Sequence, residues 1–292
     1  MNAASELFED ERAALVRHAY RMLGDRAEAE DAVQDAYLRW SAARESATVA
    51  DDRAYLRTTV TRLCIDRLRS ARARREVYVG PWLPEPIVQA GAPDPEAIVA
   101  LADDVSFALL LALERLSALE RAAFLLHDVM EVPFAEVAAT LGRSEDAVKA
   151  LASRARTHVR GPRARAALPA REALRLRDRF AAAIASGDLA GLTALLTDDV
   201  VLVSDSGGKV PAAMVPVAGP DRVGRLLLGL ARKAPAGIRV RAALVNGLPG
   251  FVLSDGGMPI QTLALESAGE RIGRIYVTRN PDKLRGVPAE PA

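Results

Sequence analysis

Residues 133–159 read PFAEVAATLGRSEDAVKALASRARTHV, an order that predicts two helices joined by a tight turn. Pro133 suits the start of a short helix over residues 134–141, and Gly142 provides its stop. Ser144 then caps a second helix, whose first turn holds acidic side chains that the helix dipole favours. The pattern is typical of a helix-turn-helix that binds duplex DNA, although an ordinary helical hairpin would look the same.

The second helix of this pair would present its N-terminal residues to base edges in the major groove. These residues are Ser144, Glu145, Asp146, Lys149 and Ala150. Further along the helix, three arginines would meet phosphates: Arg154, Arg156 and Arg160. An earlier helix begins at the capping-box pattern of residues 117–120.

A strongly basic segment lies upstream, over residues 53–75. It holds eight arginines against one acid, Asp66, and therefore a net charge of +7. Arginines neutralise phosphates, and the tyrosine and threonines between them can reach or stack on bases. A preceding acidic segment places Asp31, Asp35 and Leu38 on one helical face. A charge run is usually a solvated face, but this run beside an acidic helix favours nucleic-acid binding.

Composition bounds the remaining possibilities. The chain has 292 residues, of which 50% are hydrophobic and 4% aromatic, and this favours packed helices. Its net charge of +1 does not favour any particular class of binding partner. The single cysteine, Cys64, excludes a disulfide framework or a cysteine zinc cluster within the chain and fits a reducing cytoplasm. Neither a signal peptide nor an apolar run of about 18 residues is evident, so we expect a cytoplasmic protein without membrane contact.

Proline and glycine divide the chain into parts. Residues 79–95 hold too many prolines for a regular helix and read as a linker. After residue 169, helices are followed by β-rich runs separated by turn residues, which predicts an α+β domain. The expected domains are a helical domain over residues 1–78, a proline-rich linker over 79–99, a second helical domain over 100–162 and an α+β domain over 170–285.

Three segments carry a resemblance to a known family. Residues 25–40, DRAEAEDAVQDAYLRW, resemble region 2 of extracytoplasmic-function (ECF) sigma factors, whose equivalent helix binds the clamp of RNA polymerase. Residues 53–69, RAYLRTTVTRLCIDRLR, resemble the part that melts and reads the −10 element, and residues 133–156 resemble region 4, which reads the −35 element. The resemblance thus implies promoter recognition by two helical domains.

The resemblance also implies site residues. The implied polymerase contacts are Asp31, Gln34, Asp35, Leu38 and Trp40. The implied −10 contacts are Arg53, Tyr55, Arg57, Thr58, Thr61, Arg62, Asp66 and Arg69. The implied −35 contacts are Ser144, Glu145, Asp146, Lys149, Ala150, Arg154 and Arg156.

The linker and the third domain narrow the resemblance to the SigJ-like branch, which carries a SnoaL-like domain of the NTF2 type. Residues 82–86 read WLPEP, residues 205–209 read DSGGK with Ser206 in place of a glycine, and residues 280–284 read NPDKL. Trp82, flanked by prolines, is expected to dock on the third domain because an indole is costly to leave in water. The implied regulatory contacts are Trp82, Leu83, Pro84, Asp205, Gly207, Gly208, Lys209, Asn280, Pro281, Asp282, Lys283 and Leu284.

We therefore expect a multidomain protein with two all-α sigma domains, a region 2 helical bundle and a region 4 helix-turn-helix, and an α+β SnoaL/NTF2-like domain. Its expected partners are core RNA polymerase and promoter DNA. The C-terminal domain would modulate activity as a fused anti-sigma-like element, with a pocket that could take a small ligand. We expect a monomer when the protein is free, and no cofactor or metal ion.

Two other functions stay open at this point. A helix-turn-helix repressor or activator with a ligand-sensing domain would bind duplex without polymerase, but the acidic helix beside the arginine segment argues against it. An enzyme on the third domain would need acid–base groups, yet the histidines, His18, His127 and His158, all precede it. The glycines at 207–208 lack phosphate-loop spacing and predict a tight turn. Binding to core polymerase would separate these functions.

Overall fold

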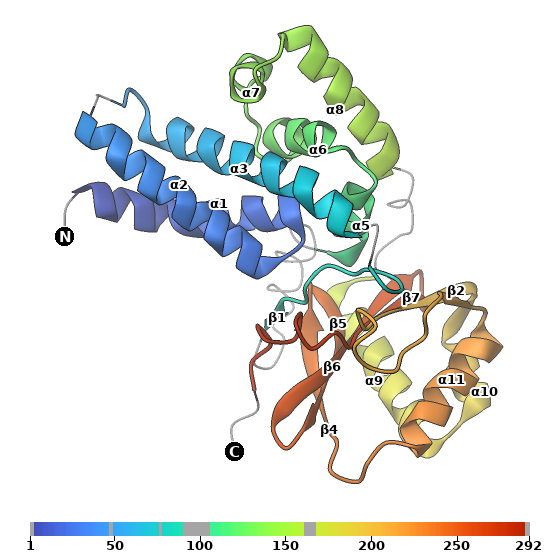
Figure 1. Ribbon diagram of the computed structural model, residues 1–292. Coiled ribbons are helices and arrows are strands. Elements are labelled where there is room, and N and C mark those ends of the chain that lie inside the picture. Colours follow the sequence, from blue (N-terminus) through green and yellow to red (C-terminus); the bar gives the residue numbers. More distant parts are fainter. Residues whose placement is uncertain (1–2, 47–48, 76–77, 90–105, 161–167, 290–292) are drawn as a thin grey trace. The chain divides into compact units, whose positions relative to one another are not determined.

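The computed structural model describes residues 3–46, 49–75, 78–89, 106–160 and 168–289. The chain forms two compact units. The helical unit comprises Met1–Val77 and Ala108–Arg163, and the sheet unit comprises Tyr78–Phe107 and Ala164–Ala292. The sheet unit therefore includes both the teal segment that follows the first three helices and the yellow-to-red C-terminal part (Figure 1).

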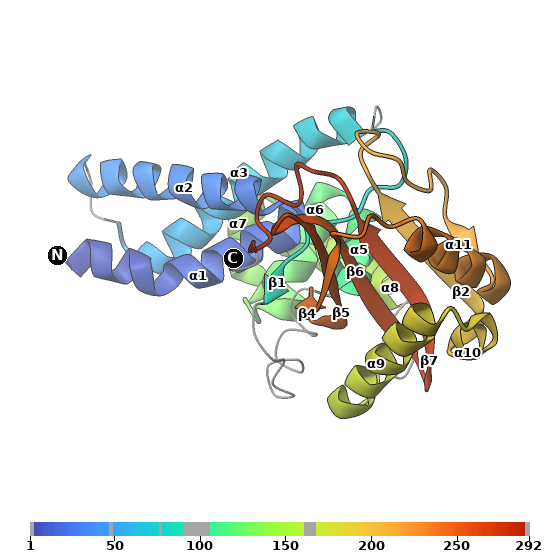
Figure 2. The same ribbon diagram turned by 90° about the horizontal axis from the view of Figure 1, so that it is seen from below.

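The first part of the helical unit is a bundle of three helices that lie alongside one another (Figures 1 and 2). They are α1 (Ala3–Leu23), α2 (Arg26–Ser46) and α3 (Asp52–Arg75). The left-handed Gly24 (φ 71°) separates α1 from α2. Side chains from all three helices form the buried core: Leu15, Tyr20, Met22, Val33, Trp40, Leu56, Val60 and Cys64. Burial raises the pKa of the Cys64 thiol to about 12, so this thiol is a packing group.

The second part of the helical unit contains the expected helix-turn-helix. Its elements are α5 (Phe107–Glu114), α6 (Ala118–Phe124), the π-helical turn η1 (Leu125–Val129), α7 (Phe134–Leu141) and α8 (Glu145–Arg160). The capping box of Ser117 and Glu120 is confirmed, because each side chain bonds the other residue's backbone N–H. Gly142 ends α7 in the left-handed region (φ 61°). A separate core holds these helices together: Ala123, Leu126, Val132, Val137, Ala138, Val148, Leu151 and Ala152.

In its described residues, the sheet unit contains seven strands and three helices. The helices are α9 (Ala170–Ser186), α10 (Leu189–Ala194) and α11 (Pro220–Arg232). The strands are β1 (Val88–Gln89), β2 (Leu196–Asp205), β3 (Val217–Ala218), β4 (Arg239–Val245), β5 (Leu248–Asp255), β6 (Met258–Ala268) and β7 (Arg271–Thr278). Their order is β1-β4-β5-β6-β7-β2-β3, and only the β2–β7 pair is parallel.

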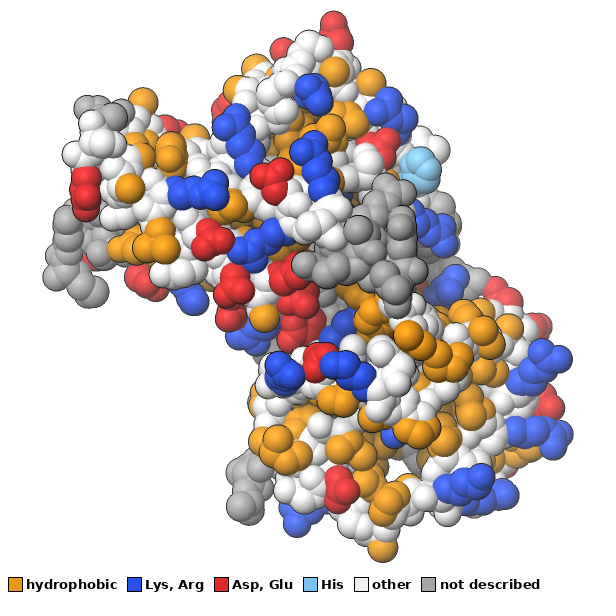
Figure 3. Space-filling view, viewed as in Figure 1, with side chains coloured by type: hydrophobic (Ala, Val, Ile, Leu, Met, Phe, Trp, Pro, Cys, Tyr) orange, Lys and Arg blue, Asp and Glu red, His pale blue; other side chains and the backbone are white. Residues whose placement is uncertain are grey.

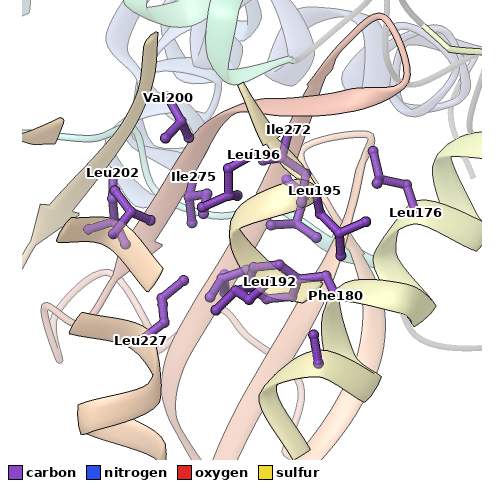
Figure 4. Close-up of a cluster of buried hydrophobic side chains, with 14 of the residues drawn as sticks. Leu176, Phe180, Leu192, Leu195, Leu196, Val200, Leu202, Leu227, Ile272 and Ile275 are labelled. Atoms are coloured by element: carbon purple, nitrogen blue, oxygen red, sulfur yellow. The ribbon is translucent and has the colours of Figure 1, made fainter. Parts of the chain in front are cut away.

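The two faces of the sheet have different covers. Helices α9, α10 and α11 cover one face, and the space between them and the strands is filled by apolar side chains (Figures 2 and 4). Phe180 from α9, Leu192 from α10, Leu227 from α11 and Ile275 from β7 meet in this core. Because side chains alternate along a strand, every second strand residue points away from this core, toward the opposite face of the sheet. The expected α+β class of the third domain is confirmed.

Two local expectations differ from the structure. The β-rich runs after residue 169 were expected to be separated by turns, but the polar pair Asp198 and Asp199 lies within β2, where a register shift between Leu196 and Val201 accommodates it. Residues 79–89 were expected in an interdomain linker, but they belong to the sheet unit, and Val88 pairs with Val245 of β4. Within the described ranges, no helix has the length and apolar character needed to cross a bilayer.

Candidate functional site

The acidic helix α2 exposes most of the side chains expected to contact polymerase. Asp31, Gln34 and Leu38 are exposed, Leu38 at 57%. Asp35 is half-buried, and its carboxylate accepts a hydrogen bond from the Arg67 guanidinium of α3 at 2.7 Å. These residues share one side of α2 because they recur every three or four positions.

Trp40 was expected on this polymerase-binding surface, and its burial contradicts that expectation. Its side chain is 1% exposed and lies beside Phe8 and Tyr37, with ring centroids 6.5 and 6.0 Å away. Its indole N–H donates to Asp52 Oδ1 at 2.8 Å, which joins α2 to the start of α3. Trp40 is therefore a packing residue, since a large ring on the inner face of the bundle gains more from burial than from exposure.

Helix α3 carries the expected −10 residues, and it presents them unequally. Arg53, Arg62, Asp66 and Arg69 are exposed, while Tyr55, Arg57 and Thr58 are half-buried. Thr61 is fully buried, which contradicts a direct role in DNA contact. Its hydroxyl donates to the backbone oxygen of Arg57 at 2.8 Å and lies 2.9 Å from Nε2 of His18. Thr61 therefore fixes α3 against α1.

Three of the −10 candidates contact helix α7, and we call this set the α3–α7 contact. Arg57 pairs with Glu136 at 3.0 Å, and the hydroxyls of Thr58 and Thr140 are 3.1 Å apart. Arg62 donates to the backbone oxygens of Thr140 at 2.9 Å and Ala139 at 3.2 Å. This contact could not be predicted from the sequence, because Glu136 and Thr140 lie in the supporting helix of the helix-turn-helix and no local pattern relates them to α3.

Helix α8 exposes the expected −35 residues along one side. Ser144, Glu145, Asp146, Lys149 and Ala150 are all exposed. Val148, Ala152 and Ala155 face the core instead. Ser144 caps the helix as expected, because its hydroxyl accepts from the Ala147 N–H at 3.3 Å. On the face seen in Figure 3, blue Lys and Arg side chains and red Asp and Glu side chains lie interspersed over the helical unit.

Two arginines of α8 are held by acids of α6 and η1. Arg154 Nε donates to Glu120 Oε1 at 2.8 Å, and Arg156 Nε donates to Asp128 Oδ1 at 2.5 Å. The bond from Arg154 is the main cause of the lowered pKa of Glu120, and Ser117 adds to it. Each bond uses Nε, and a guanidinium group carries further N–H donors on its terminal nitrogens with which it could bind phosphates.

The motif residues of the sheet unit converge on one buried carboxylate. Asp205 ends β2 and is 0% exposed. We define the Asp205 cluster as Tyr78, Leu83, Asp205, Asn280 and Lys283. Asp205 Oδ1 accepts from the Tyr78 hydroxyl at 2.5 Å, and Oδ2 accepts from the Leu83 N–H at 2.8 Å and from Lys283 Nζ at 2.7 Å. One carboxylate therefore joins the segment after α3, the end of β2 and the C-terminal tail.

Lys283 is enclosed by the segment that it binds. Its ammonium group donates to the backbone oxygen of Leu83 and lies 4.3 Å from the ring centroid of Trp82 and 5.1 Å from that of Tyr78. Two aromatic faces and a carboxylate around one cation form a favourable, largely dry setting for its charge. Trp82 thus lies against the sheet unit. Burial, together with the hydrogen bond to Asp205, raises the pKa of the Tyr78 hydroxyl.

Steric constraints require glycine at two positions of the DSGGK segment, residues 205–209. Gly207 and Gly208 have φ values of 58° and 72°, which only glycine adopts without strain. A Cβ on Gly207 would stand 2.6 Å from Nδ2 of Asn280, and one on Gly208 would stand 2.9 Å from Cβ of Val79. Ser206 has a negative φ, so its replacement of a glycine costs no backbone strain.

The rim of the cluster carries the remaining motif residues. Lys209 pairs with Asp282, and this bond is the main cause of the lowered pKa of Asp282. Leu284 packs with Val88 and Val252 on the sheet face opposite α9, α10 and α11. Pro84 is buried, and Pro281 is exposed. The sequence missed Tyr78, whose hydroxyl also accepts from Asn280 Nδ2 at 2.9 Å.

A second contact fixes the other end of the connection between α3 and α5. Phe107, the first residue of α5, is 1% exposed and stacks on Tyr276 of β7 with ring centroids 4.9 Å apart. The Tyr276 hydroxyl donates to Glu266 of β6 at 2.5 Å, which orients the ring. The sheet unit therefore holds Tyr78–Gln89 at one end and Phe107 at the other, while residues 90–105 lie outside the described ranges.

Comparison with known proteins shows the family of the chain. Two family models match the chain, Sigma-70 region 2 over residues 7–74 and Sigma-70 region 4 over residues 106–159. The ECF RNA polymerase sigma factor SigJ of Mycobacterium tuberculosis is 43% identical over 295 residues, which cover 96% of this chain and 93% of that protein. This chain belongs to the ECF family of RNA polymerase sigma factors.

Further relatives extend the likeness over all three parts of this sigma factor. The probable ECF sigma factor SigI of Mycobacterium tuberculosis is 33% identical over 96% of this chain and 94% of that protein. The crystal structure of Mycobacterium tuberculosis SigJ matches with a TM-score of 0.77 at 40% identity and covers 98% of this chain and 100% of that chain. The likeness therefore includes the sheet unit as well as the helical unit.

Family membership establishes the general function. An ECF sigma factor binds core RNA polymerase and promoter DNA and directs promoter-specific transcription initiation. This sigma factor is thus an initiation factor and not an enzyme. Its helical unit supplies regions 2 and 4, and its sheet unit is an additional C-terminal domain.

Proposed function

We propose that the exposed side of α2 is the surface that binds core polymerase. Asp31, Gln34, Asp35 and Leu38 lie there, and an apolar side chain 57% exposed among acids is typical of an interface. Trp40 supports this surface from inside. A Leu38→Asp variant should bind core polymerase more weakly in a pull-down, whereas Glu172→Gln on α9 should bind normally.

We propose that α3 reads the −10 element and α8 reads the −35 element. On α3 the contacts would come from Arg53, Tyr55, Arg57, Thr58, Arg62, Asp66 and Arg69. On α8 they would come from Ser144, Glu145, Asp146, Lys149, Ala150, Arg154 and Arg156. The exposure of most of these side chains supports this division, because base and phosphate contacts both require accessible donors and acceptors.

We propose that the sheet unit modulates transcription as a fused anti-sigma-like element. The observation that carries this proposal is the Asp205 cluster, in which one buried carboxylate bonds the connection between regions 2 and 4 and the C-terminal tail. The stacking of Phe107 on Tyr276 adds a second contact, at the start of region 4. A domain that binds both ends of this connection can restrict the relative positions of the two DNA-binding regions. It does so because it reduces the length of chain that is free to move between them.

Reconstitution with core polymerase tests the proposal. Run-off transcripts from a candidate promoter should appear with the full chain, and truncation after Val277 should abolish or greatly change them. Lys283→Ala should resemble the truncation, because the tail loses its bond to Asp205. Arg285→Ala is the matched control, since Arg285 lies in the same tail and is 80% exposed. Equal transcription from all four proteins would contradict a regulatory role.

A small ligand for the sheet unit and a monomeric free state also stay proposals. The buried hydroxyls of Ser254 and Thr278 have no hydrogen-bond partner among the described residues, which supports a polar ligand or bound water beside them. A thermal-shift screen of small polar molecules tests the first proposal, and sedimentation equilibrium of the free protein tests the second.

A further inference from the structure

The outer side of helix α9 carries three arginines on one line. Arg171, Arg175 and Arg179 recur every four positions, and all three are exposed. Helix α9 lies in the helical layer over the sheet (Figure 2), and its inner side packs Leu176 and Phe180 into the core of the sheet unit. The three guanidinium groups, which we call the α9 arginine row, therefore face away from the sheet.

The acids of α9 leave most of this charge unopposed. Asp178 Oδ1 accepts hydrogen bonds from Nε and Nη2 of the buried Arg177, at 2.9 and 2.7 Å, so this acid is held by an arginine outside the row. Glu172 is the other acid of the helix. Within the described ranges, no ion pair joins a member of the row to an acid. Four arginines against two acids give α9 a net charge of +2, and the exposed positive charge is concentrated in the row.

The position of Arg171 conflicts with the preferences of the helix itself. Arg171 lies in the first turn of α9, where the positive end of the helix dipole disfavours a cation and favours an anion. The N-cap residue is Pro169, which offers no side-chain acceptor to the first N–H groups. Sequences break such local rules mainly at functional sites. An external anion would satisfy both the guanidinium group and the helix end.

The chain between α8 and α9 limits how far the row can lie from DNA. Helix α8 ends at Arg160, and α9 begins at Ala170. Even when fully extended, the chain between these two residues spans at most about 35 Å. This length is about one turn of B-DNA. If α8 lies in the major groove of the −35 element, α9 must begin within about one turn of that groove.

We propose that the α9 arginine row binds backbone phosphates of the duplex upstream of the −35 element. The inference rests on the proposed reading of the −35 element by α8. Region 2 and core polymerase occupy the flank on the −10 side, so the upstream flank is open to the sheet unit. The row is about 12 Å long, which matches the width of the major groove, so its ends reach phosphates on both sides of it. The sheet unit then adds a sequence-independent contact to the specific contacts of α8.

Holoenzyme binding to two promoter fragments tests the proposal. One fragment ends at the upstream edge of the −35 element, and the other extends about two helical turns further upstream. The variant Arg171→Gln/Arg175→Gln/Arg179→Gln should bind the longer fragment about tenfold more weakly than the wild type. Its slope of log K against log salt should be smaller by about 2–3, or about 0.9 for each lost phosphate contact. On the shorter fragment the two proteins should bind equally.

Two further variants separate charge from side-chain loss. Arg171→Lys/Arg175→Lys/Arg179→Lys keeps the charge and should retain the wild-type slope on the longer fragment. Arg285→Gln removes an arginine that is 80% exposed in the C-terminal tail and should change neither fragment's affinity. Equal slopes for the glutamine variant and the wild type on the longer fragment would overturn the proposal, as would an equal loss on both fragments.

The same assay distinguishes failure of this inference from failure of −35 reading by α8. Lys149→Ala on α8 should weaken binding to both fragments, whatever the row does. Unchanged binding by Lys149→Ala would count against the role of α8 alone. A pull-down without DNA measures the affinity of the glutamine variant for core polymerase. A loss there would assign the row to an acidic surface of polymerase and overturn the contact with DNA.

Discussion

The α3–α7 contact and the Asp205 cluster both join segments far apart in the chain, but they differ in burial. The Arg57 and Glu136 side chains are 23% and 54% exposed, whereas those of Lys283 and Asp205 are 10% and 0% exposed. A solvent-exposed ion pair contributes about 0–1 kcal/mol because water screens its charges. Removal of one member of a buried pair costs about 3–5 kcal/mol because the other charge stays behind without a partner.

This difference predicts which of the two connections is more easily broken. Donors of the α3–α7 contact can exchange their acceptors for water or for phosphates at little cost. Asp205 also satisfies the backbone N–H groups of Leu83 and Gly207, and opening the cluster would leave these groups unpaired inside the protein. The segment of residues 78–89 should therefore stay on the sheet unit under conditions that break the α3–α7 contact.

The largest effect is expected from removal of the buried carboxylate of the Asp205 cluster. Asp205→Ala leaves the Lys283 ammonium without a carboxylate and two backbone donors without an acceptor. We expect the free energy of unfolding of the sheet unit to fall by about 3–5 kcal/mol. Urea denaturation followed by tryptophan fluorescence measures this, because Trp82 lies against Lys283.

Asp198→Ala provides the matched control on the same strand. Asp198 pairs with Arg271 at 3.0 Å, and its side chain is 91% exposed. We expect the loss of this pair to change the free energy of unfolding by less than about 1 kcal/mol. Similar losses from both substitutions would mean that burial does not set the strength of the Asp205 cluster.

A buried titratable base extends the comparison to the helical unit. His18 is 1% exposed, and burial lowers its pKa from 6.5 to about 4, with Arg21 and Arg57 adding to the effect. Between these values the unfolded chain binds a proton that the folded chain refuses, so stability falls as the pH falls from about 6.5 to about 4. The expected loss is about 3 kcal/mol, from about 1.4 kcal/mol for each pH unit.

Denaturation of the wild type and of His18→Gln across this pH range measures the effect. The substitution removes the titrating group, so the difference in stability between the two proteins should shrink as the pH falls. His158→Gln is the control, because His158 lies on the exposed side of α8. A difference that does not depend on pH would show that His18 becomes protonated in the folded protein.

The sequence predicted the local structure well because local rules govern it. Gly24, Gly142 and Gly187 end helices in the left-handed conformation, and the Asn246–Gly247 pair turns β4 into β5. These features depend on a few adjacent residues, and their backbone preferences are strong. The helix-turn-helix and the α+β third domain could be predicted for this reason.

The long-range contacts could not be derived in the same way. Residues 79–89 read as a linker because prolines exclude a helix, but their pairing with β4 depends on Val245, some 150 residues away in the chain. Trp40 and Thr61 were placed on surfaces because the rotation of α2 and α3 toward their shared core was unknown. The Asp205 cluster was anticipated only as motif segments, and its chemistry required coordinates that bring Tyr78 and Lys283 to one carboxylate.

A smaller effect is expected where an exposed arginine is held by an acid. Glu120→Gln weakens the hold on Arg154, so holoenzyme affinity for a duplex with the −35 element should fall about two- to fivefold. The salt dependence should stay the same, because no phosphate contact is lost. Arg154→Ala should reduce the slope of log K against log salt by about 0.9. Tighter binding by Glu120→Gln would mean that Glu120 competes with DNA for Arg154.

The smallest expected effect lies within the DSGGK segment itself. Lys209 and Asp282 pair at the rim of the Asp205 cluster, with side chains 52% and 43% exposed. Their pair lowers the pKa of Asp282, so its contribution is present at neutral pH and is lost as the pH falls below about 4. Lys209→Met should change the free energy of unfolding by less than about 1 kcal/mol, because water can replace the lost partner. A loss close to that of Asp205→Ala would mean that the rim and the buried carboxylate act as one unit.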